Sequence, residues 1–163
     1  MNCNSILTRA TRAHLPELLI MIKEFCAIDE HDYDEQRLRR SLPALLDGDD
    51  YGVVWLLGEP VDGYAVVTWG YSLESGGVEA LIDEIYVRSR EAGLGSKVLT
   101  AILGDCRARG CKIVFLETEA RNARVRRFYE RAGFRVDDSI WMSLSLDNGN
   151  EQNSDTGMRT RNG

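Results

Sequence analysis

The sequence predicts one α/β domain of the α+β type, in which helices flank a single mixed sheet. Its 163 residues match the size of one domain, and 44% hydrophobic with 28% charged residues is typical of a globular chain. Apolar residues recur at helical spacing in some segments, whereas others alternate or run unbroken as strands do. Tight turns separate the middle strands and helices separate the later ones. This mixture indicates antiparallel and parallel pairing in one sheet.

The first half of the chain predicts a strand, helices and an antiparallel set of strands. A short strand at 6–10 precedes a helix that Thr11 caps and that contains Pro16 in an early turn. An acidic connector at 29–35 leads to a second helix, whose leucines end near Gly48. The spacing of apolar residues is then no longer helical, and segments rich in Val, Trp and Tyr predict strands at 51–57, 64–71 and 78–87.

The second half predicts helices and strands in alternation. Helices are expected at 97–109 and 123–132, each closed by a glycine. The unbroken apolar run at 112–118 predicts a buried strand. Alternating residues at 140–146 predict a last strand.

The end of the chain and its charge narrow the function. Residues 147–163 are polar apart from Met158 and cannot bury enough surface to offset their ordering entropy, so we expect a disordered tail after a domain at 1–146. The net charge of −6, from 20 basic and 26 acidic residues, argues against a nucleic-acid-binding protein, whose affinity depends on neutralising phosphates. No apolar run has the length of a bilayer span and the N-terminus lacks a signal-peptide pattern. We therefore expect no membrane partner and a cytoplasmic protein.

The metal-binding residue types are few. The chain holds 4 cysteines and 2 histidines, and no two cysteines stand at Cys-x-x-Cys spacing. We therefore expect no metal site, and thiols that stay reduced and take no part in the chemistry.

A glycine-containing turn joins the strand that ends at Val87 to the next helix. Glycine allows the backbone to approach a ligand, and a helix N-terminus offers N–H groups and a positive dipole end that suit a pyrophosphate. The spacing is neither G-x-G-x-x-G nor a P-loop. A tight turn also needs glycine, so a purely structural interpretation stays open. The turn consists of Arg90, Glu91, Ala92, Gly93, Leu94, Gly95 and Ser96.

Two further features combine polar groups with apolar surroundings. Asn122 is a good cap for the helix at 123–132, and Tyr129 lies at the edge of that helix's apolar stripe, where a core role is the alternative. Asp83 and Glu84 interrupt an apolar strand, and strand neighbours point to opposite faces. A carboxylate that faces the interior needs a partner or a raised pKa. One of the two is therefore a candidate general base, unless both are structural.

In this order and spacing, the three features resemble those of the GNAT superfamily of acyl-CoA-dependent N-acetyltransferases. The resemblance covers residues 6–146. The segment between Val87 and Gly93 is shorter than usual in that family and lacks its proline, which predicts a tighter turn. The motifs Q/R-x-x-G-x-G/A, Asn…Tyr-x-x-x-Gly-Phe and acidic-x-x-x-Val are matched by Arg90, Gly93, Gly95, Asn122, Tyr129, Gly133, Phe134, Asp83 and Val87.

The resemblance implies a GNAT-like fold and the binding of acetyl-CoA as cosubstrate. The backbone of Ile85, Tyr86 and Val87 would pair with the pantetheine amides like an added strand. The turn at 90–96 would cradle the pyrophosphate through backbone N–H groups, and Asn122 would contact the pantetheine arm.

The resemblance also implies direct transfer of the acetyl group to a primary amine, without a covalent enzyme intermediate. Tyr129 would protonate the departing thiolate. Asp83 or Glu84 would take a proton from the amine. Asp83 is preferred because it holds the family's acidic position, four residues before Val87.

Two charged segments and the nature of the acceptor leave alternatives. Arg124, Arg127 and Arg131 share a helical face that is either solvated or in contact with the 3′-phosphate of CoA. The connector at 29–35 either stays solvated or attracts a small cationic amine, with His31 and Tyr33 as candidate pocket residues. Two alternatives to a small-molecule N-acetyltransferase stay open: an acyl-CoA-binding regulatory module without turnover, and an acetyltransferase that acts on protein amines. A homodimer is compatible with the resemblance.

Overall fold

The computed structural model describes residues 6–89, 93–118 and 122–146. In these residues one five-stranded sheet has the order β1-β2-β3-β4-β5, with antiparallel pairing from β1 to β4 and parallel pairing of β4 with β5. This mixed sheet with flanking helices confirms the predicted fold class. Its strands are β1 (Leu7–Arg9), β2 (Gly52–Leu57), β3 (Gly63–Ser72), β4 (Gly77–Val87) and β5 (Ile113–Leu116).

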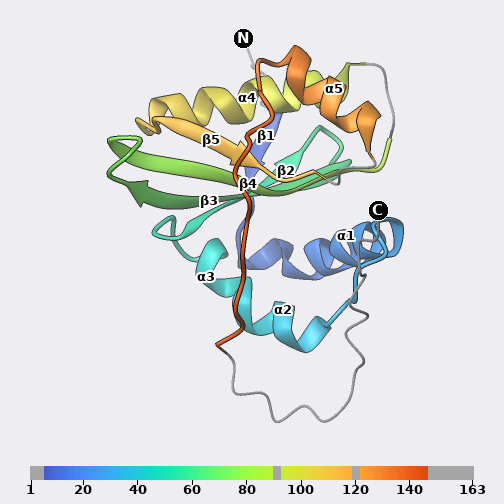
Figure 1. Cartoon of the computed structure of the whole chain (residues 1–163). Helices are drawn as coiled ribbons and strands as arrows, with labels where there is room; N and C mark the ends of the chain where they lie inside the picture. The colour runs from blue at the N-terminus through green and yellow to red at the C-terminus, as the bar shows by residue number, and fades with distance from the viewer. Residues whose placement is uncertain (1–5, 90–92, 119–121, 147–163) are drawn as a thin grey trace, which may run out of the picture.

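Helices cover both faces of the sheet (Figure 1). The single turn η1 (Arg12–His14) and the helices α1 (Leu15–Ile28), α2 (Glu35–Ser41) and α3 (Pro43–Leu46) lie on one face, and α4 (Leu94–Ala108) and α5 (Ala123–Arg131) lie on the other. No helix in the described residues is long and apolar enough to cross a membrane.

Each face has its own apolar core. Under α4, the buried Val98, Leu99 and Ile102 pack on inward residues of the sheet. Under α1, Leu18 and Ile22 pack on the opposite side chains of the same strands. Fully burying one such aliphatic side chain contributes about 1.5–3 kcal/mol, so the sheet is held from both sides.

Two predicted elements differ in the structure. The second helix is divided into α2 and α3, because Pro43 has no N–H to continue the hydrogen-bond ladder of α2. The strand β5 is shorter than predicted, and none of its residues is fully buried.

The predicted strand at 140–146 is wrong. The structure has no strand there, and the chain passes from the α5 side of the sheet to the α1 side with its apolar residues exposed (Figure 1). Trp141 is 78% exposed and Met142 is 91% exposed. Alternation alone does not make a strand, because a strand also needs a neighbour for its backbone hydrogen bonds.

A bulge interrupts β4 at Asp83. Val67 of β3 pairs with Ile82 and Val66 pairs with Glu84, so Asp83 has no counterpart in the β3–β4 register. One extra residue shifts the alternation of a strand by one position. Before the bulge Ile82 faces the α4 core, and after it Glu84 points to the α1 face.

Candidate active site

The strand β4 loses one of its two neighbours near its end. The β4–β5 ladder stops at the pair of Ile82 with Leu116, whereas the β3–β4 ladder continues to Val87. On its β5 side, the segment 83–87 therefore has no strand partner in the described part of the chain. Such an edge can pair with the amides of an extended ligand.

The open end of β4 leads to the N-terminus of α4. Gly93 caps this helix with φ +95°, a left-handed conformation that glycine adopts without strain. Leu94, Gly95 and Ser96 form the first turn, so the helix begins three residues earlier than the predicted start at Lys97. A Cβ atom on Gly95 would stand 3.6 Å from Cζ of Phe128, an ordinary van der Waals contact, so the packing of α4 against α5 does not itself require glycine at this position. Arg90, Glu91 and Ala92 lie outside the described residues.

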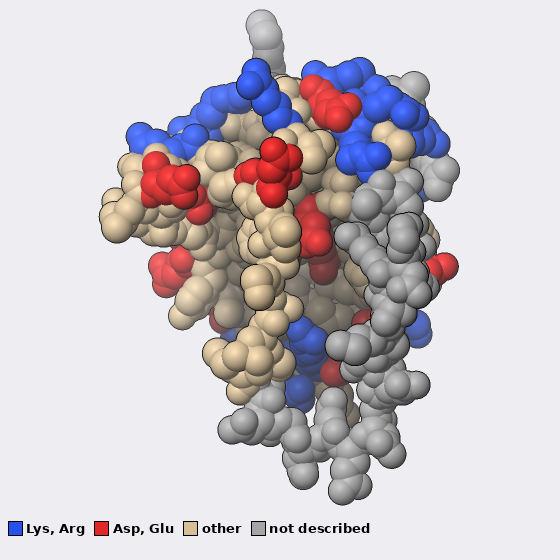
Figure 2. All heavy atoms as spheres, viewed as in Figure 1, with Lys and Arg blue, Asp and Glu red and all other residues tan. Residues whose placement is uncertain are grey.

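A shallow hollow separates α4 from α5. Apolar Leu99 and Phe128 form part of its wall, and Ser96 and Arg131 add polar groups at its rim. Figure 2 shows Lys and Arg side chains gathered above this region, over α5. The basic surface therefore adjoins the first turn of α4, where the dipole also favours an anion.

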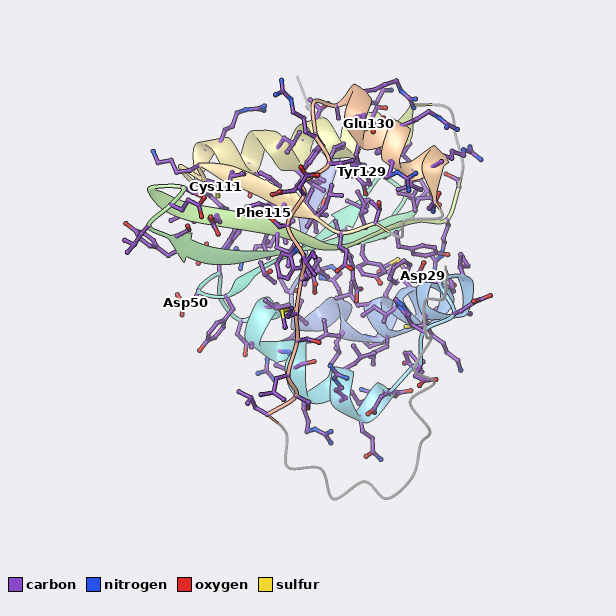
Figure 3. The ribbon with its side chains drawn as sticks, viewed as in Figure 1. Asp29, Asp50, Cys111, Phe115, Tyr129 and Glu130 are labelled. Atoms are coloured by element: carbon purple, nitrogen blue, oxygen red, sulfur yellow. The ribbon has the colours of Figure 1, made fainter. Side chains whose placement is uncertain are left out.

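The helix α5 carries Asn122 and Tyr129. The Asn122 side chain caps the helix by accepting a hydrogen bond from the Val125 N–H at 3.2 Å. Tyr129 is 8% exposed and lies on the sheet side of α5 (Figure 3). Its ring packs at centroid distances of 5.1 Å from Phe128 and 5.7 Å from Phe134. Burial raises the pKa of its hydroxyl, so Tyr129 is protonated at neutral pH and can act as a proton donor.

Glu84 has a different environment from Asp83. Its side chain is half-buried on the α1 face, and the Tyr64 hydroxyl donates a hydrogen bond to Oε2 at 2.6 Å. Burial raises the pKa of Glu84, and the negative charge of Asp83 raises it further, whereas the Tyr64 hydrogen bond and His31 lower it. Asp83 itself is exposed. Only Glu84 thus combines burial with a raised pKa, the usual properties of a general base.

Three carboxylates of the acidic connector have local partners. Asp29 lies 3.3 Å from His31, and Glu35 pairs with Arg39 at 2.7 Å. Asp34 caps α2 by accepting from the Arg37 N–H. The ion pair with Arg39 offsets the charge of Glu35, whereas the helix cap leaves the charge of Asp34 in place.

Predicted site residues lie on both faces of the open end of β4. Glu84 and Tyr86 face α1, whereas Ile85 and Val87 pack against the core under α4, which also includes Tyr129. Sequence reasoning missed Tyr64, because its contact with Glu84 depends on the bulge. Within the described chain, no group of three or more His, Cys, Asp and Glu could hold a metal ion.

The sequence profile of the acetyltransferase (GNAT) family matches residues 16–134. The chain belongs to this family. A putative acetyltransferase from Arthrobacter sp. FB24 is similar in structure, with 30% identity, a TM-score of 0.76, and coverage of 90% of this chain and 99% of that one. An integron cassette protein from the mobile metagenome of Cole Harbour Salt Marsh has 28% identity, a TM-score of 0.76, and coverage of 89% and 93%.

A more distant structure shares the fold. An aminoglycoside acetyltransferase from an uncultured soil metagenomic sample, in complex with sisomicin, has 19% identity and a TM-score of 0.70, with coverage of 86% of this chain and 95% of that one. No curated protein matches the chain. Membership of this family supports an acyltransferase activity. The site residues described above indicate how the domain could catalyse such a reaction.

Proposed function

We propose that the protein transfers the acetyl group of acetyl-CoA to the primary amine of a small acceptor. The observation that carries this proposal is the placement of the half-buried Glu84 carboxylate at the point where β4 loses β5 as a neighbour. A base and an open strand edge then occur together, in a family of acetyltransferases.

The donor would bind along the open end of β4. The backbone of Ile85, Tyr86 and Val87 would pair with the pantetheine amides on the side where β5 has ended. The first turn of α4 and the preceding residues of the 90–96 turn would hold the pyrophosphate through N–H groups and the helix dipole. Asn122 would contact the pantetheine arm from the start of α5.

The reaction would be a direct attack on the thioester. Glu84 would accept a proton from the acceptor ammonium, and the neutral amine nitrogen would form a bond to the acetyl carbonyl carbon. The carbon–sulfur bond would then break, and Tyr129 would protonate the leaving thiolate of CoA. The nitrogen would lose its second proton as the amide forms, and this proton would restore the Tyr129 hydroxyl through solvent. Burial and hydrogen bonding favour Glu84 as the base over Asp83, the residue that sequence analysis preferred.

The charge of the acceptor is a finer part of the proposal. Because Glu35 already pairs with Arg39, attraction of a cationic amine would depend on other carboxylates of the connector, such as Asp32 and Asp34. Screening by salt acts over about 8–10 Å, so a rise of the amine KM with ionic strength would support a cationic acceptor. An unchanged KM would point to a neutral or anionic acceptor body.

The test is a panel of primary amines with acetyl-CoA, read by release of the CoA thiol and by mass spectrometry of the product. We expect thiol release that depends on one class of small amine. A protein that binds CoA in calorimetry but releases no thiol with any amine would instead be a regulatory binding module. Acetylation of lysines in added proteins, without turnover of small amines, would make it a protein acetyltransferase.

A further inference from the structure

We infer that Tyr64 is a positioning residue, whose hydroxyl holds the ionised Glu84 carboxylate in the orientation that accepts the proton of the acceptor amine. This inference rests on the proposed role of Glu84 as the general base. It adds a residue of β3 that acts through Glu84 and has no contact with the donor in the proposal.

The hydroxyl of Tyr64 is fixed by its surroundings. Tyr64 is 0% exposed, and its ring packs against Phe25 and Tyr86, at centroid distances of 6.5 Å and 6.0 Å. A side chain packed in this way has little rotamer freedom, so its hydroxyl stays at the Glu84 carboxylate. The bond of 2.6 Å has the length of a charge-assisted O–H···O⁻ hydrogen bond.

The bond also selects which oxygen is available for catalysis. Tyr64 donates to Oε2 of Glu84, which leaves Oε1 as the oxygen that takes the proton. A donor of this kind stabilises the charged form of the carboxyl and thereby lowers its pKa. Without Tyr64, burial would hold Glu84 protonated to a higher pH, and less of the enzyme would carry an ionised base.

Other groups near Glu84 act on its charge but do not hold it in this way. Asp83 raises its pKa from the neighbouring position of β4, and His31 of the connector lowers it. Cys26 of α1 is close enough for the Glu84 charge to raise the pKa of the thiol, which is already raised by burial. Among these groups, Tyr64 is the one with a hydrogen bond to the carboxylate.

Tyr86 provides a matched control for the titration. It faces the same side as Tyr64 and belongs to the same aromatic cluster, with its ring 6.0 Å from that of Tyr64. Its hydroxyl donates to Glu24 at 3.1 Å and makes no bond to Glu84. The variant Tyr86→Phe therefore removes a hydroxyl from the cluster and leaves the Tyr64–Glu84 bond in place.

The experiment measures the pKa of Glu84 in the full chain without substrate, by NMR of ¹³C-labelled glutamate side chains, with Glu84→Gln to assign the resonance. We expect Tyr64→Phe to raise this pKa by about one to two units, the typical contribution of a hydrogen bond to a charged group. We expect Tyr86→Phe to shift it far less. The acid limb of the kcat/KM profile in Tyr64→Phe is expected to move to higher pH by the same amount as the titration.

A second variant covers the case in which Tyr64→Phe does not fold. 3-Fluorotyrosine at position 64 keeps the ring and makes the hydroxyl a stronger donor, so it is expected to lower the pKa of Glu84. A Glu84 titration that moves with neither variant overturns the role of Tyr64 and leaves Glu84 as the proposed base. A titration that moves while the acid limb stays in place overturns the assignment of Glu84 as base, and the catalytic part of this inference with it.

Discussion

The two halves of β4 lie in one strand but have different surroundings. From Gly77 to Ile82 the strand has β3 on one side, and β5 joins the other side from Glu79 onward. From Asp83 to Val87 it keeps β3 and has no second partner in the described structure. The first half is thus paired on both sides, as an interior strand of a sheet is. The second half is paired with β3 on one side only.

The difference shows how one strand can serve both stability and binding. Ladder hydrogen bonds to β3 keep the second half straight and ordered, so an extended ligand would not have to order it on binding. The bulge marks the border between the halves and places a carboxylate on the face opposite Ile82. Substitutions in the first half should therefore mainly reduce stability, and substitutions in the second half should mainly reduce function.

The largest effect is expected from Glu84→Gln in the second half. An amide cannot accept the proton of the amine, so turnover should fall by about 10²–10⁴-fold. In the parent enzyme, the acid limb of the kcat/KM profile should lie above the ordinary glutamate pKa, because burial raises the pKa of Glu84. Steady-state kinetics between acid and neutral pH measure both quantities.

Asp83→Asn is the partner variant at the bulge. It should have a smaller effect on turnover and should move the acid limb to lower pH, because a negative charge that raises the pKa of Glu84 is removed. A larger loss in Asp83→Asn than in Glu84→Gln would reverse the two assignments.

Ile82→Ala tests the first half. Ile82 is 4% exposed in the core under α4, so truncation should lower the free energy of unfolding by about 2–5 kcal/mol. Ile85→Ala, beyond the bulge, should lower the free energy of unfolding by less, because Ile85 is only half-buried. Urea denaturation of the two variants makes the comparison, and equal losses would show that the open half is as tightly packed as the closed one.

Tyr129→Phe tests the helix that faces the open half. Turnover should fall by about tenfold, less than general acid catalysis can contribute, because a thiolate leaves readily without full protonation. The KM for acetyl-CoA should change less than kcat, since the aromatic ring and its packing against Phe128 and Phe134 are kept. An unchanged kcat would leave Tyr129 as a core residue only.

Ser96→Glu tests the first turn of α4, with an effect no larger than that of Tyr129→Phe. A carboxylate in the first turn of α4 interacts favourably with the helix dipole, but it repels a pyrophosphate bound there. The affinity for acetyl-CoA should therefore fall by about tenfold at low salt. Ser96→Gln adds the same length without charge and serves as the control. Calorimetry at two salt concentrations measures the difference, and equal affinities of the two variants would place the pyrophosphate elsewhere.

Sequence patterns predicted the fold class because the two periodicities were clear. The hairpin of β2 and β3 and the helix α4 all follow from local spacing and turn residues. The position of Glu84 could not be predicted in this way, because the bulge has neither Gly nor Pro at Asp83 and exists only in the register with β3. The contact of Tyr64 with Glu84 depends on that register as well.

The failed strand prediction at 140–146 has a related cause. The alternation of Ile140, Met142, Leu144 and Leu146 is as clear as in β4, yet these residues are exposed and unpaired in the described structure. Local sequence reports which residues would share a face, and it does not report whether a neighbouring strand is in reach. The site residues in the 90–92 segment remain predictions, as does the tail at 147–163.

Asp83 is the extra residue of β4, and the bulge that it forms shifts the alternation of side chains along the strand by one position. Any side chain at this position keeps the residue count, so Glu84 stays on the α1 face whatever residue stands before it. Loss of the residue would leave Val67 opposite Ile82 and Val66 opposite Glu84 in an unbroken register, so Glu84 and Tyr86 would stay on the α1 face and Ile85 and Val87 on the α4 face. In the divergence of such a domain, this position can therefore accept either a substitution or the loss of its residue without a change in the face that Glu84 occupies.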